Sequence, residues 1–430
     1  MRILIVSWEY PPVVVGGLGR HVHHLATELA AEHDVVVITR QPTGSDALTH
    51  PTSDTRVDGV RVIAVAEDPP EFEFGRDMMT WTLAMGHAFV RTGLTALAGD
   101  RRASGGEASG IGGWEPEIVH AHDWLVAHPA IALAQFFDVP LVSTIHATEA
   151  GRHSGWVSGI INRHVHSVEQ WLAGESDALI TCSESMRDEV NRLFGPDLAE
   201  IQVIHNGIDI RTWPFAEREP SSGPAELLFA GRLEYEKGVQ DLLAALPRIR
   251  RTNPGTTLTI AGTGTQQDWL AEQARRHRVS RSVNFVGAVD HQTLVDLMHR
   301  CDAIVLPSRY EPFGIVALEA AATGIPLVVS TAGGLGEAVT DGVTGLSFPP
   351  ADVTALAAAV RATLDRPDLA AERARRARDR LTAEFSWHDV AERTAGVYLS
   401  AKRRVRHPIG RRPIPLRPLP ERDPGQPTAE

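Results

Sequence analysis

The sequence predicts an α/β protein built from two doubly wound parallel sheets. Short apolar runs alternate with helix-length amphipathic segments along most of the 430 residues, which is the pattern of parallel strands joined by crossover helices. The alternation stops near residue 207 and restarts at residue 225, and the chain is too long for one ordinary hydrophobic core. We therefore expect two domains, 1–207 and 225–385, joined by a linker at 208–224 and facing a cleft.

The predicted strands of the first domain are short and apolar. We expect them at residues 2–7, 34–40, 60–66, 117–120, 140–145, 178–182 and 201–205. The helices that connect them are expected from the glycine loop at 16–19 through about residue 32, at 74–97 and from residue 184. Residues 100–114 are rich in Gly and Ser and show no periodicity, so they predict a flexible surface insertion.

The second half repeats the pattern. We expect its strands at 226–230, 257–261, 283–286, 303–306 and 326–330. Helices are expected at 238–251, 266–276, 291–300, from about residue 314, and at 353–364, 370–385 and 386–402. From residue 402 to 417 there are seven basic residues and no acid, interleaved with prolines. Residues 403–430 therefore predict a disordered basic, Pro-rich tail.

The composition excludes several classes of protein. A formal charge of −12 argues against a general nucleic-acid binder. Cys182 and Cys301 each lie in or beside a short apolar run, which favours buried free thiols in a reducing compartment. The chain starts directly with an apolar strand, and no run of about 18 uncharged apolar residues follows. We expect a cytoplasmic protein without integral membrane association.

Residues 308–322 carry the first candidate site. Glu311 and Glu319 lie eight residues apart, with Phe313 and Gly314 between them. If a helix begins near Gly314, the two carboxylates are at most about 12 Å apart, which is the scale of a sugar nucleotide. The first-turn N–H groups favour an anionic diphosphate, and each carboxylate can accept hydrogen bonds from two hydroxyls. The alternative is an amphipathic helix with solvated acids.

The turn at residues 231–238 carries two cations. Arg232 and Lys237 lie five residues apart between a predicted strand and helix, and the chain contains no Asp-x-Asp triplet. A diphosphate can therefore be neutralised by a guanidinium fork and an ammonium, without a metal ion. The alternative is a solvated basic turn. Glycines follow three further strands of the same predicted sheet, at residues 262, 264, 287, 333, 334 and 336, and this accumulation at one edge favours a ligand site.

Polar residues also follow two strands of the first domain. His122, Asp123 and His146 are candidates because open α/β sheets bind ligands at the carboxyl ends of their strands. The alternative for either histidine is a structural role. On the first helix, His21, His23 and His24 do not share one face. This spacing favours solvated or helix-packing histidines over a metal site.

Four motifs, in this order and spacing, resemble those of glycosyltransferase family 4. They are GGLG, HNGID, GRLEYEKG and EPFGIVALE, and the resemblance spans about residues 1–400. The family consists of retaining GT-B enzymes, including glycogen synthases and many bacterial glucosyl- and mannosyltransferases. Three longer stretches, including STIHATEAGRHSGW, resemble the actinobacterial α-1,4-glucosyltransferases of 6-O-methylglucose lipopolysaccharide biosynthesis.

The resemblance implies roles for residues of the second domain, which would be the Rossmann-like nucleotide-sugar-binding half. Arg232 and Lys237 would bind the donor diphosphate. Glu319 would hold the ribose hydroxyls. Glu311 would contact the transferred glucose, together with the backbone of Phe313 and Gly314.

The resemblance also implies that the first domain is a Rossmann-like, acceptor-side half. Gly17 would lie by the phosphates and His146 by the sugar near the reaction centre. Asp123 and Asn206 match positions that line the same cleft. The last helix, 386–402, would return to the first domain.

The implied reaction is transfer of glucose from a nucleotide-glucose, with retention, to the non-reducing end of an α-1,4-glucan or methylglucan. No metal or other cofactor is expected. Bacterial starch and glycogen synthases carry KTGGLGD at the first glycine loop, where this chain has VVGGLGR. This difference leaves UDP-glucose and ADP-glucose both open as donors. The alternatives are a mannosyltransferase acting on a lipid or other small acceptor, and a catalytically silent GT-B binding protein.

Overall fold

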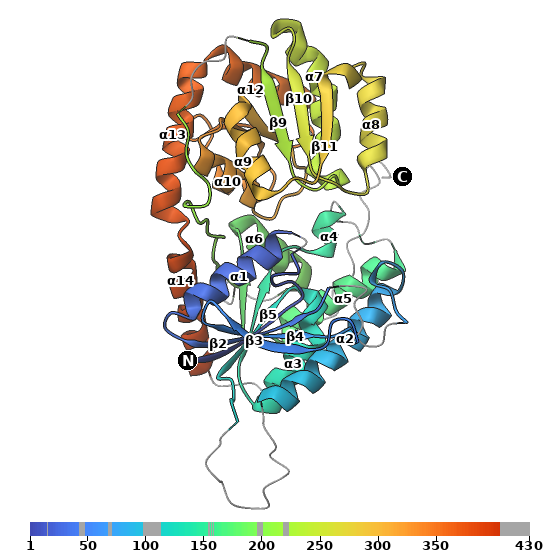
Figure 1. Ribbon diagram of the computed structural model, residues 1–430, viewed down its shortest axis with the longest axis vertical. Coiled ribbons are helices and arrows are strands. Elements are labelled where there is room, and N and C mark those ends of the chain that lie inside the picture. The colour runs from blue at the N-terminus through green and yellow to red at the C-terminus, as the bar shows by residue number, and fades with distance from the viewer. Residues whose placement is uncertain are drawn as a thin grey trace, which may run out of the picture. The chain divides into compact units, whose positions relative to one another are not determined.

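The computed structural model describes residues 1–14, 16–42, 48–67, 71–97, 113–153, 155, 157, 159–195, 201–217 and 223–404 (Figure 1). It divides into two compact units. The first domain comprises Met1–Cys182, Met186–Ile204 and the segment from Trp387 onward, and the second comprises Ser183–Ser185 and His205–Ser386. The predicted insertion at 100–114, apart from its last two residues, and the predicted tail beyond residue 404 lie outside the described residues.

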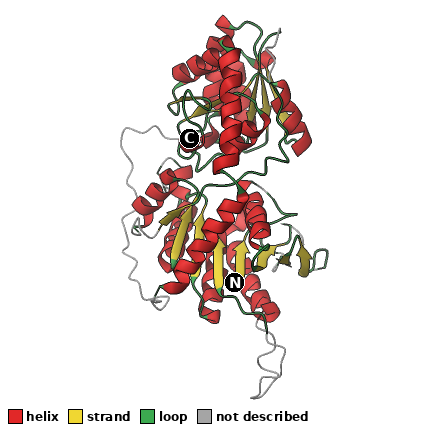
Figure 2. Cartoon of the chain, turned by 90° about the vertical axis from the view of Figure 1, so that its left-hand side faces the viewer, coloured by secondary structure: helices red, strands yellow, loops and turns green. Residues whose placement is uncertain are grey.

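The first domain contains an eight-stranded sheet in the order β3-β4-β2-β1-β5-β6-β7-β8. All pairs are parallel except β3 with β4, which is antiparallel. Strands β1 and β2 are mostly apolar and buried because helices cover both faces of the sheet (Figure 2). The strands are β1 (Arg2–Ser7), β2 (Asp34–Arg40), β3 (Ser53–Val57), β4 (Val60–Val65), β5 (Ile118–His122), β6 (Leu141–Ile145), β7 (Ala178–Thr181) and β8 (Ile201–Val203).

A helix from the far end of the chain completes the first domain's core. Trp387 and Tyr398 of α14 are buried in one apolar cluster with Val22 and Leu25 of α1. Tyr398 also lies with its hydroxyl 2.7 Å from Nδ1 of His120, which is buried in β5. The helices of this domain are α1 (Gly17–Leu29), α2 (Phe74–Leu97), α3 (Ala127–Phe137), α4 (Glu149–Arg152), α5 (Ile160–Glu175), most of α6 (Glu184–Phe194) and α14 (Trp387–Arg403), with a 3-10 turn η1 (Trp124–Val126).

The second domain contains a six-stranded, all-parallel sheet in the order β11-β10-β9-β12-β13-β14. Its strands are β9 (Glu226–Ala230), β10 (Thr257–Ala261), β11 (Val283–Gly287), β12 (Ala303–Leu306), β13 (Leu327–Ser330) and β14 (Leu346–Phe348). Its helices are η3 (Tyr235–Lys237), α7 (Val239–Thr252), α8 (Gln267–Arg276), η4 (Ser280–Ser282), α9 (His291–Arg300), α10 (Ile315–Thr323), α11 (Leu335–Ala338), α12 (Val353–Asp365) and α13 (Pro367–Glu384). The predicted α/β class with two doubly wound parallel sheets is confirmed.

The sequence prediction missed several elements, two longer helices among them, and misplaced several strand ends by one or two residues. Strand β3 was predicted as a polar loop, because an edge strand of exposed residues carries no apolar pattern. Strand β14 and helices α3, α4, α5 and α11 were not predicted. Strand β5 was predicted to end at His120 but continues to His122, so His122 belongs to the sheet rather than to the loop after it. Among the described residues, no helix has the length and apolar character needed to cross a membrane.

Candidate functional site

The strand order of the second domain reverses between β9 and β12. The chain runs outward from β9 to β10 and β11, then returns to place β12 on the other side of β9. The loops at 231–238 and 307–314 follow these two strands and therefore flank the reversal. Ligands of open α/β sheets bind at this place, beyond the carboxyl ends of the strands. The two loops carry five of the predicted donor-site residues: Arg232, Lys237, Glu311, Phe313 and Gly314.

Lys237 and Glu311 form an ion pair between the two loops. Lys237 Nζ donates to Glu311 Oε2 at 2.7 Å, and the two side chains are 16% and 17% exposed. The hydroxyl of Ser308 donates to the same oxygen at 3.1 Å. A charge-assisted bond of this length between partly buried groups fixes their relative position. The sequence predicted both residues in one site but gave no sign that they pair.

Arg232 is held more loosely. Its side chain is 50% exposed, and its nearest acid is Glu236, with Nη2 3.5 Å from Oε1. Exposed ion pairs of this kind contribute little to stability. The guanidinium can therefore turn toward an anionic ligand at small energetic cost.

Arg309 anchors the 307–314 loop and was not predicted from the sequence. Its guanidinium makes two hydrogen bonds to Asp241 on α7, at 2.8 and 2.7 Å, and a third to the hydroxyl of Tyr235. The backbone N–H of Arg309 also donates to the carbonyl of Glu236 at 2.7 Å. This network ties the loop that carries Glu311 to the turn that carries Lys237.

Glycines in this region, including Gly333 and Gly334 of the predicted set, allow neighbouring turns to pack closely. A Cβ at Gly238, whose φ is +71°, would lie 1.9 Å from the carbonyl oxygen of Pro307. A Cβ at Gly333 would lie 2.3 Å from the Glu311 carbonyl oxygen, and one at Gly334 would lie 2.4 Å from the Cα of Phe313. Gly238, Gly333 and Gly334 thus have a packing role, which is to hold the 307–314 loop in place, whereas a Cβ at Gly287 would meet open space.

The side chains of three predicted donor-site residues are buried. Phe313, Glu319 and Asn206 are 2%, 2% and 4% exposed. The expectation for Phe313 concerned its backbone, which the burial of its ring does not contradict. Glu319 lies on α10, and a hydrogen bond from a ribose hydroxyl requires its carboxylate to become accessible.

The strand order of the first domain reverses between β1 and β5. Gly17 is the first residue of α1, which follows β1, and no side chain caps this helix. The N–H groups in the first turn of a helix have no acceptor within the helix, and such groups bind anions in many folds. The N–H of Gly16, just before α1, donates to Glu9 at 3.1 Å. His122 ends β5, and the neighbouring strand β6 ends just before His146. The first domain therefore also brings its predicted residues to a reversal point.

Asp123 connects the ends of β5 and β6. Its Oδ1 accepts a hydrogen bond of 2.7 Å from the backbone N–H of His146. Burial raises the pKa of Asp123 to about 6, although this bond, the Ala147 N–H and the charge of Arg152 lower it. The residue has φ 63° and ψ 174°, a conformation that costs a non-glycine residue on the order of 1–3 kcal/mol. This strained turn fixes the backbone of His146.

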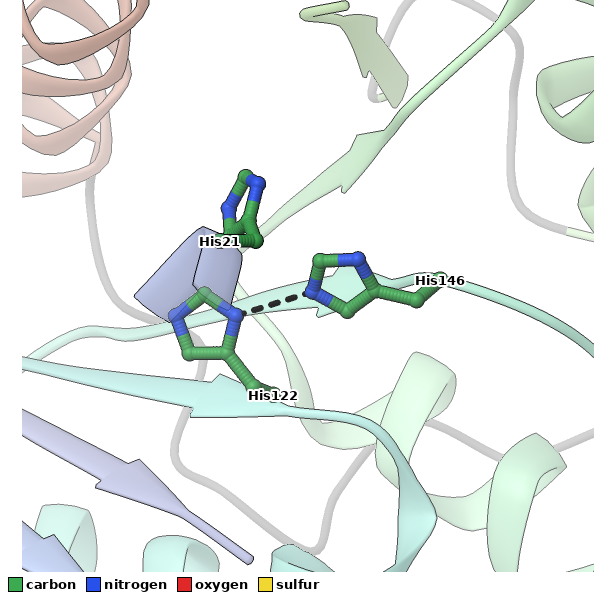
Figure 3. Close-up of side chains that lie close together, drawn as sticks. All are labelled: His21, His122 and His146. Atoms are coloured by element: carbon green, nitrogen blue, oxygen red, sulfur yellow. Dashed lines mark hydrogen bonds between the residues drawn. The ribbon is translucent and has the colours of Figure 1, made fainter. Parts of the chain in front are cut away.

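A cluster of histidines lies beside this turn (Figure 3). Nδ1 of His122 and Nε2 of His146 are 3.0 Å apart and share a hydrogen bond. The ring of His21, from α1, lies 4.7 Å from that of His146 and 5.6 Å from that of His122, measured between centroids. Burial lowers the pKa of His146 to about 3 and that of His122 well below its usual value. Both imidazoles are therefore neutral near pH 7.

The contact of His21 with this cluster was not predicted. The spacing of the three histidines on α1 carries no information about partners on other elements; His23 packs on Tyr10 and His24 on Trp387. The available signal was the helical period, since His21 lies on the buried face of α1 with Val22, Leu25, Ala26 and Leu29.

Both halves of the chain match known families. Residues 15–212 match the family described as Glycosyltransferase Family 4. Residues 211–380 match the family described as Glycosyl transferases group 1.

One curated relative and two solved structures illustrate the similarity. The glycogen synthase of Mycobacterium tuberculosis (strain ATCC 25618 / H37Rv) is 66% identical over 425 residues, which is 98% of this chain and 100% of that protein. Sucrose-phosphate synthase from Thermosynechococcus elongatus superimposes with a TM-score of 0.76 at 23% identity, covering 93% of this chain and 98% of that one. The catalytic domain of starch synthase IV from Arabidopsis thaliana, bound to ADP and acarbose, gives 0.70 at 17% identity, covering 94% and 99%.

Proposed function

The chain belongs to glycosyltransferase family 4 and has the GT-B fold, and from that premise we propose that it is a retaining glucosyltransferase that extends an α-1,4-glucan or methylglucan. The observation that carries this proposal is the 66% identity, over 98% of the chain, to a protein named glycogen synthase. The donor in this proposal is UDP-glucose or ADP-glucose. The acceptor is the non-reducing end of the glucan.

The Lys237–Glu311 ion pair lies where the strand order of the second domain reverses, and this position supports a role for both residues in binding the donor. In the proposal, Lys237 and Arg232 neutralise the diphosphate, one as a point charge and the other as a hydrogen-bonding fork. Glu311 already accepts Lys237 and Ser308 on one oxygen, and its remaining lone pairs can accept hydroxyls of the transferred glucose. The backbone of Phe313 and Gly314 would lie beside the same sugar.

Further roles follow from the same proposal and await test. Glu319 would accept the ribose hydroxyls and Gly17 would lie by the phosphates. His146, being neutral, can both donate and accept a hydrogen bond and would contact the sugar. Asp123 would hold the backbone of His146, and Asn206 would line the site.

The proposed reaction needs no carboxylate nucleophile. The bond between glucose C1 and the phosphate oxygen breaks while a bond from C1 to the acceptor oxygen forms on the same face. The acceptor proton passes to the departing phosphate oxygen. The two cations stabilise the charge that develops on that phosphate, which is the type of contact that strengthens in a transition state. The proposal therefore requires no metal ion or other cofactor.

A donor and acceptor screen tests the function. The purified protein is incubated with UDP-glucose, ADP-glucose or GDP-mannose, and with maltooligosaccharides, methylated maltooligosaccharides or phosphatidylinositol vesicles. We expect glucose to be added in α-1,4 linkage to the maltooligosaccharides or their methylated forms. Transfer of mannose to the lipid, with none to either glucan, would replace the proposal by a lipid mannosyltransferase. No transfer with any pair would favour a catalytically silent binding protein.

A further inference from the structure

We propose that His21, His122 and His146 form a binding site for a transition-metal ion of the Zn²⁺ type within the first domain. The three side chains come from three separate elements: helix α1, the end of β5 and the loop after β6. One ring nitrogen from each lies within 4.8 Å of the other two (Figure 3). No other cluster of three potential ligands is present among the described residues.

The spacing is close to that of a metal site. Zn–N bonds of about 2.0–2.1 Å in tetrahedral geometry place ligand nitrogens roughly 3.4 Å apart. The nitrogens of His122 and His146 are 3.0 Å apart, so they would separate by a few tenths of an ångström. His21 would close the remaining gap by a change in its side-chain torsions.

A metal ion bound to both His122 and His146 takes the place of the hydrogen bond between their rings. In the metal-free site one of the two imidazoles donates its N–H to the other, so the donor must move that hydrogen to its second ring nitrogen before it can ligate. For His122 the second nitrogen is Nε2, which is buried and has no hydrogen-bond partner among the described residues. All ligands remain neutral, and no net proton release is required.

The ligand chemistry selects the metal. Three neutral imidazoles suit Zn²⁺, Co²⁺, Ni²⁺ and Cu²⁺, whereas Mg²⁺ and Ca²⁺ prefer oxygen ligands. The site is therefore distinct from a Mg²⁺ site for a diphosphate. With three protein ligands, the fourth position stays open for water or another small ligand, as in catalytic zinc sites.

The surrounding residues position His146 and form the walls of the site. Asp123 holds the backbone of His146. His120 lies 4.2 Å from His122, ring to ring, but both of its nitrogens are engaged, by Tyr398 and Thr144 at 2.7 Å each. His120 is therefore a wall of the site rather than a fourth ligand. Trp387 covers the other side of His21, at 5.4 Å between centroids.

The consequence for activity rests on the proposed function. If His146 contacts the transferred sugar, a metal ion on its ring withdraws it from the reaction. Zn²⁺ would then inhibit transfer, whereas Mg²⁺ would not. The test measures metal binding directly, so that it does not depend on this step.

The experiment uses the full-length protein, prepared without a polyhistidine tag and stripped of metal, and titrated with Co²⁺. We expect one equivalent to bind with the visible absorption of a tetrahedral Co²⁺ centre, and Zn²⁺ to displace it. His21→Gln and His146→Gln should each weaken the affinity more than about tenfold, as even indirect changes at metal sites do. His24→Gln is the matched control, because His24 is on the same helix but packs on Trp387 outside the cluster.

Binding that is absent from the wild type, or that persists unchanged in His21→Gln and His146→Gln, overturns the site. Circular dichroism and thermal melts of each variant establish that loss of Co²⁺ binding is not loss of fold. A protein that binds Co²⁺ in this way but transfers no sugar overturns the proposed function and leaves the metal site standing. Transfer of glucose without any specific Co²⁺ binding overturns the metal site and leaves the proposed function standing.

Discussion

Replacing Lys237 by alanine should remove most of the activity but lower the stability only slightly. In the proposed reaction the ammonium stabilises the charge on the leaving phosphate. A charge-assisted hydrogen bond is worth about 1.5–3 kcal/mol, and each 1.36 kcal/mol is about tenfold in rate. We therefore expect kcat/KM to fall by roughly 10- to 150-fold.

The same substitution leaves Glu311 without its ammonium partner. That carboxylate keeps the Ser308 hydroxyl and is 17% exposed, so solvent replaces part of what is lost. The loop that carries it is anchored separately by Arg309 and Asp241. The expected loss of stability is accordingly at the low end of about 1–3 kcal/mol for an unpaired polar group.

Initial rates with varied donor concentration, beside thermal melts, separate the two effects. Lys402→Ala is the matched control: it removes an ammonium that pairs at 2.5 Å with Glu117 in the first domain. The double variant with Glu311→Gln shows whether the pair acts as a unit, in which case the two losses are less than additive. Turnover of Lys237→Ala at the wild-type level would remove this residue from the site and refute the reasoning.

The remaining predictions concern charge, metal and chain ends. Arg232→Ala should lower kcat/KM by about 10-fold or more with an unchanged melting temperature, because the side chain is half exposed; wild-type rates would exclude it from the site. Activity should survive EDTA, and loss on chelation that Mg²⁺ restores would contradict the proposed role of the two cations. Deleting residues 408–430 should leave transfer to a short soluble acceptor intact, and its abolition would show that the tail takes part in catalysis. The hydrogen bonds from Lys402 and the Arg2 backbone hold the pKa of Glu117 at about 2, so its stabilisation is present above about pH 4.5 and is lost as the pH falls toward 2. The melting temperature should therefore fall less in Glu117→Gln than in wild type between about pH 5 and pH 3, and equal falls would show that Glu117 is not responsible.

Most of the fold could be predicted because the buried strands of a parallel sheet consist largely of consecutive apolar residues. β2 is an example, with residues Val35 to Arg40 all buried. The antiparallel β3 could not be found in this way, because its residues face solvent and its place in the sheet depends on pairing with β4. Pairing partners are set by the tertiary fold rather than by local pattern.

The candidate site could be predicted at the level of loops but not of contacts. Glu311 and Lys237 were placed in one site because each follows a strand, yet their ion pair depends on β9 and β12 being neighbours. Asp241, which anchors Arg309, lies in an ordinary helix 68 residues away and carries no local signal. The contacts of His21 were missed for a different reason. The helical period predicts that His21 lies on the buried face of α1, but the residues that it contacts belong to other elements.

The ion pair of Lys237 can be followed by NMR because the chain contains very few lysines. The chain has 42 basic residues, and only two of them, Lys237 and Lys402, are lysines. Reductive methylation with isotope-labelled formaldehyde would therefore mark two side-chain amines and the α-amino group, giving an NMR spectrum of three methyl signals. Their exposure differs, at 16% for Lys237 and 33% for Lys402. One resolved signal would then report the occupancy of the proposed donor site directly, without any engineered probe.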